Sequence, residues 1–472
     1  MSFLDSYFNS EDNLPIENHN VDEEILRVKS IVEQGNIYSV IESIEETLQI
    51  CIENDRYEDG LFLSNKLLDV FPYNSESWLK KGIMLNGLFR FDEALECYNK
   101  SLSLNPCDSE ALINKAATEE NLGLFVQAKD SLEMVLKTDP QNDEALFNLG
   151  LLSQHQDNFN GAVNYFKRAV EINAENSESY YELGYCYENL EMFEEALAAY
   201  NEYIEIEPYN ANGYYNRGIV YVKLNLLEKA VDSYELAISL KNDFSSAYFN
   251  KGNALADLGK LQQAIEAFKE AFKIDNTDEA CCFNIGNIYE ELGDITNAVK
   301  FYSDAIIINN EYYEAYLSRG FCYDTIGKFH LALKDFNHAI SLSQDCAEAW
   351  YAKADLEYSL GQLQEAVDSY TSALKLEPEN FQVWFNLAET YFEMGDWLEA
   401  INAYNQCISL NPNDAASHYG KAKVNFIISR PKEAIECLKS AFSIDPSMRS
   451  EFAQEYPEIR SSKLFKKLLG EY

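Results

Sequence analysis

Residues 177–210 read SESYYELGYCYENLEMFEEALAAYNEYIEIEPYN, and this stretch decides the fold. Its first half spaces large apolar residues and a glycine as on one face of a helix: Tyr180, Leu183, Gly184 and Tyr187. Its second half carries Ala196 and, four residues later, Tyr200, before Pro208. Because proline cannot continue a helix, this pattern predicts two antiparallel helices, the second of which ends before Pro208.

The same pattern repeats every 34 residues without an insertion. The alanine recurs eleven times, at Ala94, Ala128, Ala162, Ala196, Ala230, Ala264, Ala298, Ala332, Ala366, Ala400 and Ala434. Twelve residues before each one stands a glycine or an alanine, at Gly82, Ala116, Gly150, Gly184, Gly218, Gly252, Gly286, Gly320, Ala354, Ala388 and Ala422. We interpret these two small residues as facing each other, so that the backbones of the two helices approach closely.

The spacing W-x2-L-G-x2-Y, then A-x3-F, then P resembles the tetratricopeptide repeat (TPR) signature. Residues 177–210 match it at nearly every position, and Trp78 and Trp384 occupy the first aromatic position of their repeats. The resemblance implies an all-α fold, a right-handed α-solenoid (superhelix) of about 11–12 TPR helix pairs with helical caps. It also implies an inner groove lined by the first helices, which takes an extended peptide or a helix of a partner.

The predicted TPR array spans residues 41–448. Repeat 41–74 is degenerate, and the regular repeats are 75–108, 109–142, 143–176, 177–210, 211–244, 245–278, 279–312, 313–346, 347–380, 381–414 and 415–448. Before the array we expect a disordered acidic N-terminus over 1–20 and a capping helix over 21–40. After it we expect C-terminal capping helices over 449–472, because solenoids need ends with a polar outer face.

The C-terminal segment also holds a basic cluster in a very acidic protein: Arg460, Lys463, Lys466 and Lys467. A purely structural cap explains this segment, and docking of the cluster on the acidic body or on a partner is the alternative.

The composition excludes several classes of protein. The 472 residues include 79 Asp and Glu against 37 Lys and Arg, a formal net charge of −42. A hydrophobic share of 47% and an aromatic share of 13% are too high for a disordered acidic tail. Because phosphate contacts need Lys and Arg, this charge argues against a nucleic-acid partner and against an anionic membrane surface.

The ten cysteines are scattered and form no CxxC motif. Most fall at apolar helical positions, as reduced thiols do in the cytosol. The N-terminus lacks the basic start and apolar run of a secretory signal, and no stretch approaches the ~20 apolar residues that span a membrane. We therefore expect a soluble, cytoplasmic protein without membrane insertion.

No motif predicts catalysis, a metal or a cofactor. The segments from Gly252 to Lys260 and from Gly320 to Lys328 only superficially resemble phosphate loops, since their spacing is wrong by two residues. The five histidines form no ligand set, and no HExxH, GxSxG or nucleophile–base pair appears. The sequence therefore predicts no enzyme, no metal site and no cofactor.

We number positions from the first residue of each repeat, so that Ser109 is position 1 of repeat 109–142. The resemblance implies that positions 2, 5, 6, 9, 12 and 13 face the groove. Position 5 is aromatic in most repeats: Phe147, Tyr181, Tyr215, Phe249, Phe283, Tyr351, Phe385 and Tyr419. Position 6 is asparagine in six: Asn114, Asn148, Asn216, Asn250, Asn284 and Asn386. Because an asparagine amide both donates and accepts, a row of them could hold an extended peptide backbone. The average composition of TPR repeats explains the same residues equally simply.

Position 2 is glutamate in six of the eleven regular repeats: Glu76, Glu110, Glu144, Glu178, Glu314 and Glu348. A favourable interaction with the helix dipole accounts for these residues without a partner. Further acids are expected in the groove at Glu120, Glu188, Asp257, Glu290, Glu291, Asp324, Asp355, Glu389 and Glu393. A negative groove selects a basic or neutral protein or peptide partner.

Some TPR co-chaperones clamp the acidic C-terminal peptide of Hsp70 or Hsp90 with Lys and Arg at positions 2, 5 and 6. Here those positions hold only one such residue, Lys80, so we expect no binding of that peptide.

The predicted function is a non-catalytic protein–protein interaction scaffold or adaptor that binds a partner segment in the groove. The alternative is a structural or regulatory subunit of a larger assembly, which contacts its partners through the convex face or the ends.

Overall fold

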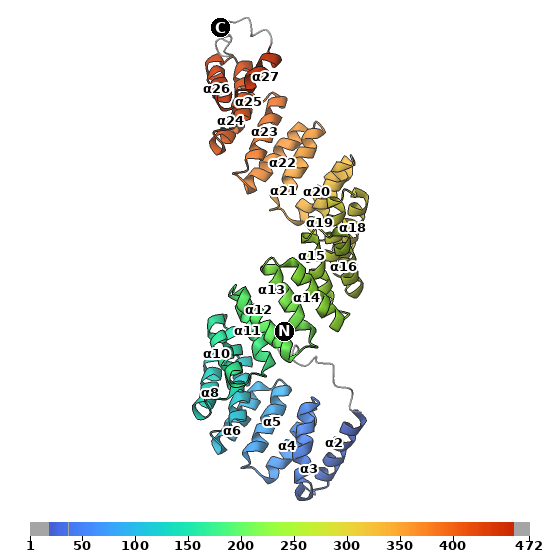
Figure 1. Ribbon diagram of the computed structural model, residues 1–472, viewed down its shortest axis with the longest axis vertical. Helices are drawn as coiled ribbons and strands as arrows, with labels where there is room; N and C mark the ends of the chain where they lie inside the picture. The colour runs from blue at the N-terminus through green and yellow to red at the C-terminus, as the bar shows by residue number, and fades with distance from the viewer. Residues whose placement is uncertain (1–17, 36, 457–472) are drawn as a thin grey trace. The chain divides into compact units, whose positions relative to one another are not determined.

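The computed structural model describes residues 18–35 and 37–456. These residues form 26 α-helices, a short 3₁₀ segment η1 (Ile37–Ser39) and no strand. The helices lie side by side as antiparallel pairs in chain order (Figure 1). The predicted all-α solenoid is therefore confirmed for the described residues.

Each pair consists of a first and a second helix, and both recur every 34 residues. The first helices are α3 (Ile41–Glu53), α5 (Ser75–Gly87), α7 (Ser109–Asn121), α9 (Asp143–Gln154), α11 (Ser177–Asn189), α13 (Ala211–Lys223), α15 (Ser245–Asp257), α17 (Glu279–Glu291), α19 (Tyr313–Thr325), α21 (Ala347–Ser359), α23 (Phe381–Met394) and α25 (Ala415–Ile427). The second helices are α4 (Tyr57–Val70), α6 (Phe91–Leu104), α8 (Phe125–Thr138), α10 (Phe159–Ile172), α12 (Phe193–Ile206), α14 (Leu227–Leu240), α16 (Leu261–Ile274), α18 (Ile295–Ile308), α20 (Phe329–Leu342), α22 (Leu363–Leu376), α24 (Trp397–Leu410) and α26 (Pro431–Ile444).

An aromatic ring of the second helix packs against the small residue of the first. A Cβ atom added to Gly184 would lie 2.5 Å from the ring of Tyr200, and one added to Gly150 would lie 2.4 Å from that of Phe166. The same approach recurs at Gly82, Gly218, Gly252, Gly286 and Gly320. The sequence interpretation placed these glycines against the alanines of the second helix. In the structure the nearest side chain is instead the ring four residues after the alanine, and glycine leaves room for it.

A left-handed residue forms the turn inside all twelve pairs, at position 15. Six turns use glycine: Gly123, Gly259, Gly293, Gly327, Gly361 and Gly395. The other six use Asp55, Phe89, Asp157, Glu191, Asn225 and Ser429. Because L side chains rarely adopt positive φ, the backbone is strained in this second group, and least at Asn and Asp.

The chain divides into two compact units, Met1–Lys241 and Asn242–Tyr472. Within each unit, successive helices pack on one another, and successive first helices also contact each other: α3 with α5, α5 with α7 and α7 with α9 in the first unit, and α19 with α21, α21 with α23 and α23 with α25 in the second. This closer approach places the first helices on the inner side of the stack in each unit.

Helix α2 (Asn18–Glu33) packs on the first helix pair. It buries Ile25, Val28 and Val32 against a cluster that includes Ile44 and Leu63. The capping helix expected over 21–40 is thus shorter and begins earlier, and α2 ends before Gly35, whose φ is 87°. Positive φ at this residue is typical of helix termination.

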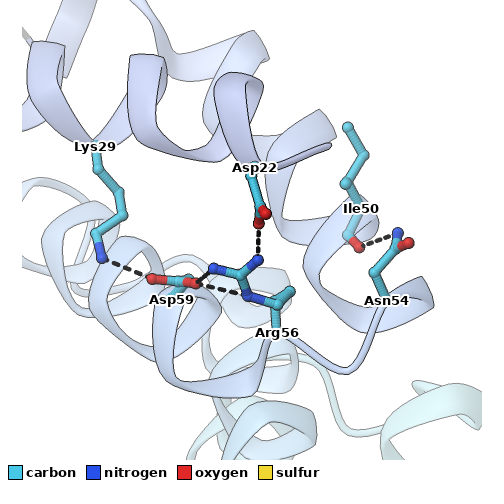
Figure 2. A network of polar contacts seen from close by, with 6 residues as sticks. All are labelled: Asp22, Lys29, Ile50, Asn54, Arg56 and Asp59. Carbon is cyan, nitrogen blue, oxygen red and sulfur yellow. Dashed lines mark hydrogen bonds and ion pairs between the residues drawn. The ribbon is translucent and has the colours of Figure 1, made fainter. Parts of the chain in front are cut away.

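An ion network ties α2 to the N-terminus of α4 (Figure 2). Asp59 accepts hydrogen bonds from Lys29 at 2.7 Å and from Arg56 at 2.7 and 3.0 Å, and Arg56 also bonds to Asp22. Burial raises the pKa of Asp59, but the hydrogen bonds and positive charges of Lys29 and Arg56 outweigh it and hold this pKa below its ordinary value.

At the other end, α27 (Met448–Glu455) buries Phe452 against Phe442, Phe426 and Tyr419. The rest of the expected C-terminal cap, including the four basic residues Arg460, Lys463, Lys466 and Lys467, lies outside the described residues, as does the expected disordered segment up to residue 17.

Relief of turn strain should stabilise the protein. Glu191, with a φ of 57°, is exposed, so Glu191→Gly should raise the free energy of unfolding by about 0.5–1 kcal/mol. The reverse change at the equivalent residue of another pair, Gly293→Ala, should lower it by a similar amount because its φ is 73°. Urea unfolding measures the free energy of unfolding of both variants. A lower value for Glu191→Gly than for the wild type would contradict the proposed backbone strain at Glu191.

Removal of the Asp59 charge should loosen α2. Asp59→Asn should lower the stability of the α2 contact by about 1–2 kcal/mol, measured by hydrogen exchange of α2 amides. Because the folded pKa of Asp59 lies below its unfolded value, its contribution is present above about pH 4 and lost as pH falls through the folded pKa. Asp59→Asn should therefore also flatten the acid dependence of α2 exchange. Asp69→Asn, at an exposed position of the same helix, is the control, and equal effects of the two changes would contradict the network's role.

Candidate functional site

The thirteen predicted site residues all lie on first helices and are all half-buried. The first unit holds Asn114, Phe147, Asn148, Tyr181, Tyr215 and Asn216, and the second unit holds Phe249, Asn250, Phe283, Asn284, Tyr351, Phe385 and Asn386. We call the surface formed by positions 2, 5, 6, 9, 12 and 13 of the first helices the first-helix face. Each unit has its own first-helix face.

Hydrogen bonds between successive repeats link these positions at several junctions. Asn216, at position 6 of its repeat, donates a hydrogen bond to the hydroxyl of Tyr181, at position 5 of the preceding repeat, at 2.9 Å. Tyr358, at position 12 of its repeat, donates a hydrogen bond to Glu393, at position 13 of the next repeat, at 2.7 Å. The pair His155 and Glu120 is equivalent, with 2.5 Å between Nδ1 and Oε1.

The position-5 aromatics are also part of the packing of each repeat. Seven of the eight contact the ring nineteen residues later on their own second helix, with ring centroids 5.4–6.2 Å apart: Phe147 with Phe166, Tyr181 with Tyr200, Tyr215 with Tyr234, Phe249 with Phe268, Phe283 with Tyr302, Tyr351 with Tyr370, and Phe385 with Tyr404. The eighth, Tyr419, contacts Phe452 of α27 instead, because residue 438 is a leucine. Only their outer edges therefore remain for a partner, and their first role is to extend the core toward the face.

The asparagines differ in what their amides already bind. Asn114 and Asn148 donate to the carbonyl four residues earlier in their own helices, at 2.9 and 2.8 Å. Asn216 bridges to Tyr181, and Asn386 bridges to Tyr351 at 3.2 Å and to Asp355 at 3.0 Å. Asn250 also has a partner in the structure. Several of these amides thus already form hydrogen bonds within the protein, to other helices or neighbouring repeats, in the absence of a ligand.

Carboxylates bonded to tyrosines are a feature of the face that sequence reasoning missed. In the second unit, Tyr370 donates to Asp355 at 2.5 Å, Tyr302 donates to Glu290 at 2.7 Å, and Tyr404 donates to Glu389. The recurring spacing of 15 residues from Asp355 to Tyr370 and from Glu389 to Tyr404 was the available signal. These bonds orient the carboxylates on the face.

Acidic residues of neighbouring repeats lie close enough to interact. Burial and then the charge of Asp355 raise the pKa of Asp324. In the first unit, burial raises the pKa of Glu144, and the charges of Glu110 and Asp143 add to this effect. Burial and the neighbouring carboxylates together thus disfavour the ionised form of both acids.

Among residues 18–35 and 37–456, no group of three His, Cys, Asp or Glu side chains is arranged to hold a metal ion. Within the same residues, every helix is too short or too polar to cross a membrane.

The bridging role of Asn216 has a measurable consequence. Asn216→Ala should lower the free energy of unfolding by about 1 kcal/mol, because it removes the hydrogen bond to Tyr181 between two repeats. Asn148→Ala, which loses only a bond within its own helix, should change stability by a few tenths of a kcal/mol. Urea unfolding distinguishes them, and equal values would show that the bridge contributes nothing.

Several solved structures are similar to the chain. Yeast Tom70 is 17% identical, with 92% of this chain and 100% of that chain covered and a TM-score of 0.38. A tetratricopeptide repeat protein from Parabacteroides merdae is 20% identical, with 55% and 98% covered and a TM-score of 0.38. YrrB, described as a TPR protein with an unusual peptide-binding site, is 23% identical, with 41% and 99% covered and a TM-score of 0.36.

No curated protein sequence matches the chain significantly. Models of individual repeats do match. Two tetratricopeptide repeat models match residues 177–210 and 381–414, and residues 75–106, 143–176, 211–244, 280–312 and 313–346. A TPR repeat model matches residues 252–293 and 354–395. These matches share the 34-residue helix-pair period of the structure, and the chain belongs to the tetratricopeptide repeat family.

Proposed function

We propose that this protein is a non-catalytic scaffold whose first-helix face binds an extended, basic or neutral segment of a partner protein. TPR repeats generally serve as protein-interaction scaffolds and not as enzymes. The observation that supports this proposal is that side chains of the face hydrogen-bond from one repeat to the next, between Tyr181 and Asn216 in the first unit and between α21 and α23 in the second. An extended segment that crosses several repeats would meet the same chemistry at each step.

The charge of the face supports a basic partner. In the second unit, Asp324, Asp355, Glu389 and Glu393 come from three successive first helices, α19, α21 and α23. Because burial and Asp355 already raise the pKa of Asp324, a lysine or arginine of the partner would relieve unfavourable charge. The aromatic edges beside these acids add apolar and cation–π contacts. An acidic peptide, including the Hsp70 or Hsp90 C-terminus, and nucleic acid would be repelled.

The alternative proposal is a structural or regulatory subunit that contacts its partners through the second helices or the ends. The exposed Ile307 on a second helix, 79% accessible, supports it, because it offers an apolar contact away from the first-helix face.

We also propose a cytoplasmic location. All ten cysteines are free and eight of them are buried. Burial raises the pKa of Cys51 to about 11 and that of Cys186 to about 12, so both remain thiols at neutral pH. Buried free thiols are typical of proteins in reducing compartments.

Three labelled peptides of equal length test the charge preference: alternating lysine and glycine, and its glutamine and glutamate counterparts. The lysine peptide should bind most tightly, and its affinity should fall as salt rises because the partner charges are screened. Asp324→Asn with Asp355→Asn should weaken its binding by about threefold to tenfold. Asn at 355 retains an oxygen that can accept from Tyr370 and Asn386, so helix packing is preserved.

The matched control is Glu365→Gln with Glu399→Gln, which removes the same charge from exposed positions of second helices. It should leave the affinity unchanged. If the control weakens binding and the Asp324 and Asp355 pair does not, the partner contacts the outer surface, and the alternative proposal replaces the first one.

A further inference from the structure

A surface cavity of about 370 Å³ in the first unit is lined by residues of the second helices α8 and α10 and of the first helix α9 between them in sequence. The residues of α9 that line it are Leu149, Leu152 and Ser153, at positions 7, 10 and 11, which are not positions of the first-helix face. The cavity is therefore distinct from the proposed peptide-binding surface.

Three residues that line this cavity depart from the pattern of the other repeats. Lys129 stands at position 21, where the other ten regular repeats are aliphatic: Leu95, Val163, Leu197, Val231, Ile265, Val299, Leu333, Val367, Ile401 and Ile435. Ser153 is smaller than its counterparts, which are Leu85, Glu119, Tyr187, Tyr221, Leu255, Tyr289, Tyr323, Glu357, Tyr391 and Asn425. Gly161 stands where five repeats carry a glutamate, at Glu93, Glu195, Glu365, Glu399 and Glu433.

The fourth residue is Arg168 at position 26, which holds one other Lys or Arg, Lys100, and an acid in three repeats: Glu202, Glu270 and Asp304. Small side chains at 153 and 161 open the space, and Lys129 and Arg168 make it positive. These residues lie on three helices and span 40 positions of the sequence, yet all four line one cavity. Because all four residues that differ from the other repeats line the same cavity, they indicate a binding site more than chance variation of the repeat sequence.

The cavity is positive in a chain whose net charge is −42. Two cations and no carboxylate line it. Within the part of the chain that the structure describes, Arg168 forms no ion pair, and Lys129 forms one with Glu133 on its own helix, at 3.8 Å. Tyr165, Asn164 and Ser153 add neutral polar groups to the wall. Because charges beyond about 8 Å are largely screened at physiological salt, these local groups affect a ligand in the cavity more than the distant acids do.

An equivalent cavity in the second unit provides an internal comparison. It is lined by α22, α23 and α24 and has the same volume of about 370 Å³. Helix α24 contributes the same four positions as α10, whereas α22 contributes positions 25, 28 and 29 and α8 contributes position 21. At positions 19 and 26 it carries Glu399 and Gln406 in place of Gly161 and Arg168. The spacing of second helices thus creates the cavity in both units, and the side chains of α8, α9 and α10 alone give it a positive lining.

We propose that the cavity between α8 and α10 binds a phosphate group. A guanidinium pairs with phosphate oxygens through two parallel hydrogen bonds, and an ammonium adds a mobile point charge. Two cations together match the charge of about −1.5 to −2 that a phosphate monoester carries at neutral pH. The cavity is larger than one phosphate group, so it also admits the chain to which a phosphoserine is attached.

The test is calorimetric titration of the full chain with inorganic phosphate, with a short phosphoserine peptide and with its unphosphorylated form, at constant ionic strength. Phosphate and the phosphopeptide should bind, and the unphosphorylated peptide should not. Tighter binding of the phosphopeptide indicates a phosphorylated segment as the source, and equal affinity indicates free phosphate. Absence of binding by both phosphate and phosphopeptide overturns the proposal.

Two variants locate the site. Arg168→Gln should weaken phosphate binding by about tenfold or more, because it removes a charge-assisted pair. Lys129→Leu should have a similar effect while keeping stability at or above that of the wild type, since it restores the aliphatic residue of the repeat. This expectation separates loss of binding from loss of folding. Unchanged affinity in both variants overturns the proposal.

Lys375→Gln is the matched control, because it removes one positive charge from the equivalent cavity beside α22 and α24. It should leave phosphate affinity unchanged. Equal weakening by Lys375→Gln and Lys129→Leu would show general attraction to surface charge and would contradict the site.

Discussion

The packing of an aromatic ring against a glycine of the partner helix is the contact on which the rest of the structure depends. At Gly184 even a single Cβ would lie 2.5 Å from the ring of Tyr200, so the helices are as close as the backbone permits. The ring in turn supports Tyr181, which lies on the first-helix face. Packing inside a pair therefore determines how far the binding residues project.

A constant repeat length carries this contact along each unit. The hydrogen bond between Tyr181 and Asn216 recurs as that between Tyr351 and Asn386, because both pairs occupy positions 5 and 6 of successive repeats. The second helices lie on the outer side, where cavities open between α8 and α10 and between α22 and α24. The same packing of helix pairs thus produces both an inner face of linked side chains and outer cavities. The side chains that line each cavity differ from repeat to repeat.

Periodicity predicts what depends on backbone geometry. The 34-residue period, the helix pairs and the assignment of Asn216 and Tyr181 to first helices all follow from spacing, because an α-helix places residues on a face by their separation. Spacing does not identify partners across helices. The pairing of Gly184 with the Tyr200 ring, and not with Ala196, depends on side-chain length and rotamer, and the bond from Tyr370 to Asp355 depends on the angle between two helices.

The sequence by itself determined the all-α repeat fold and the acidic character of the chain, because both are properties of composition and period. Tertiary structure decided which residues are available for a partner. The amides of Asn216 and Asn386 are engaged between repeats, and the position-5 rings lie half inside the core. It also decided that Lys129, Ser153, Gly161 and Arg168 share one cavity, since only the stacking of α8, α9 and α10 brings residues so far apart in sequence together.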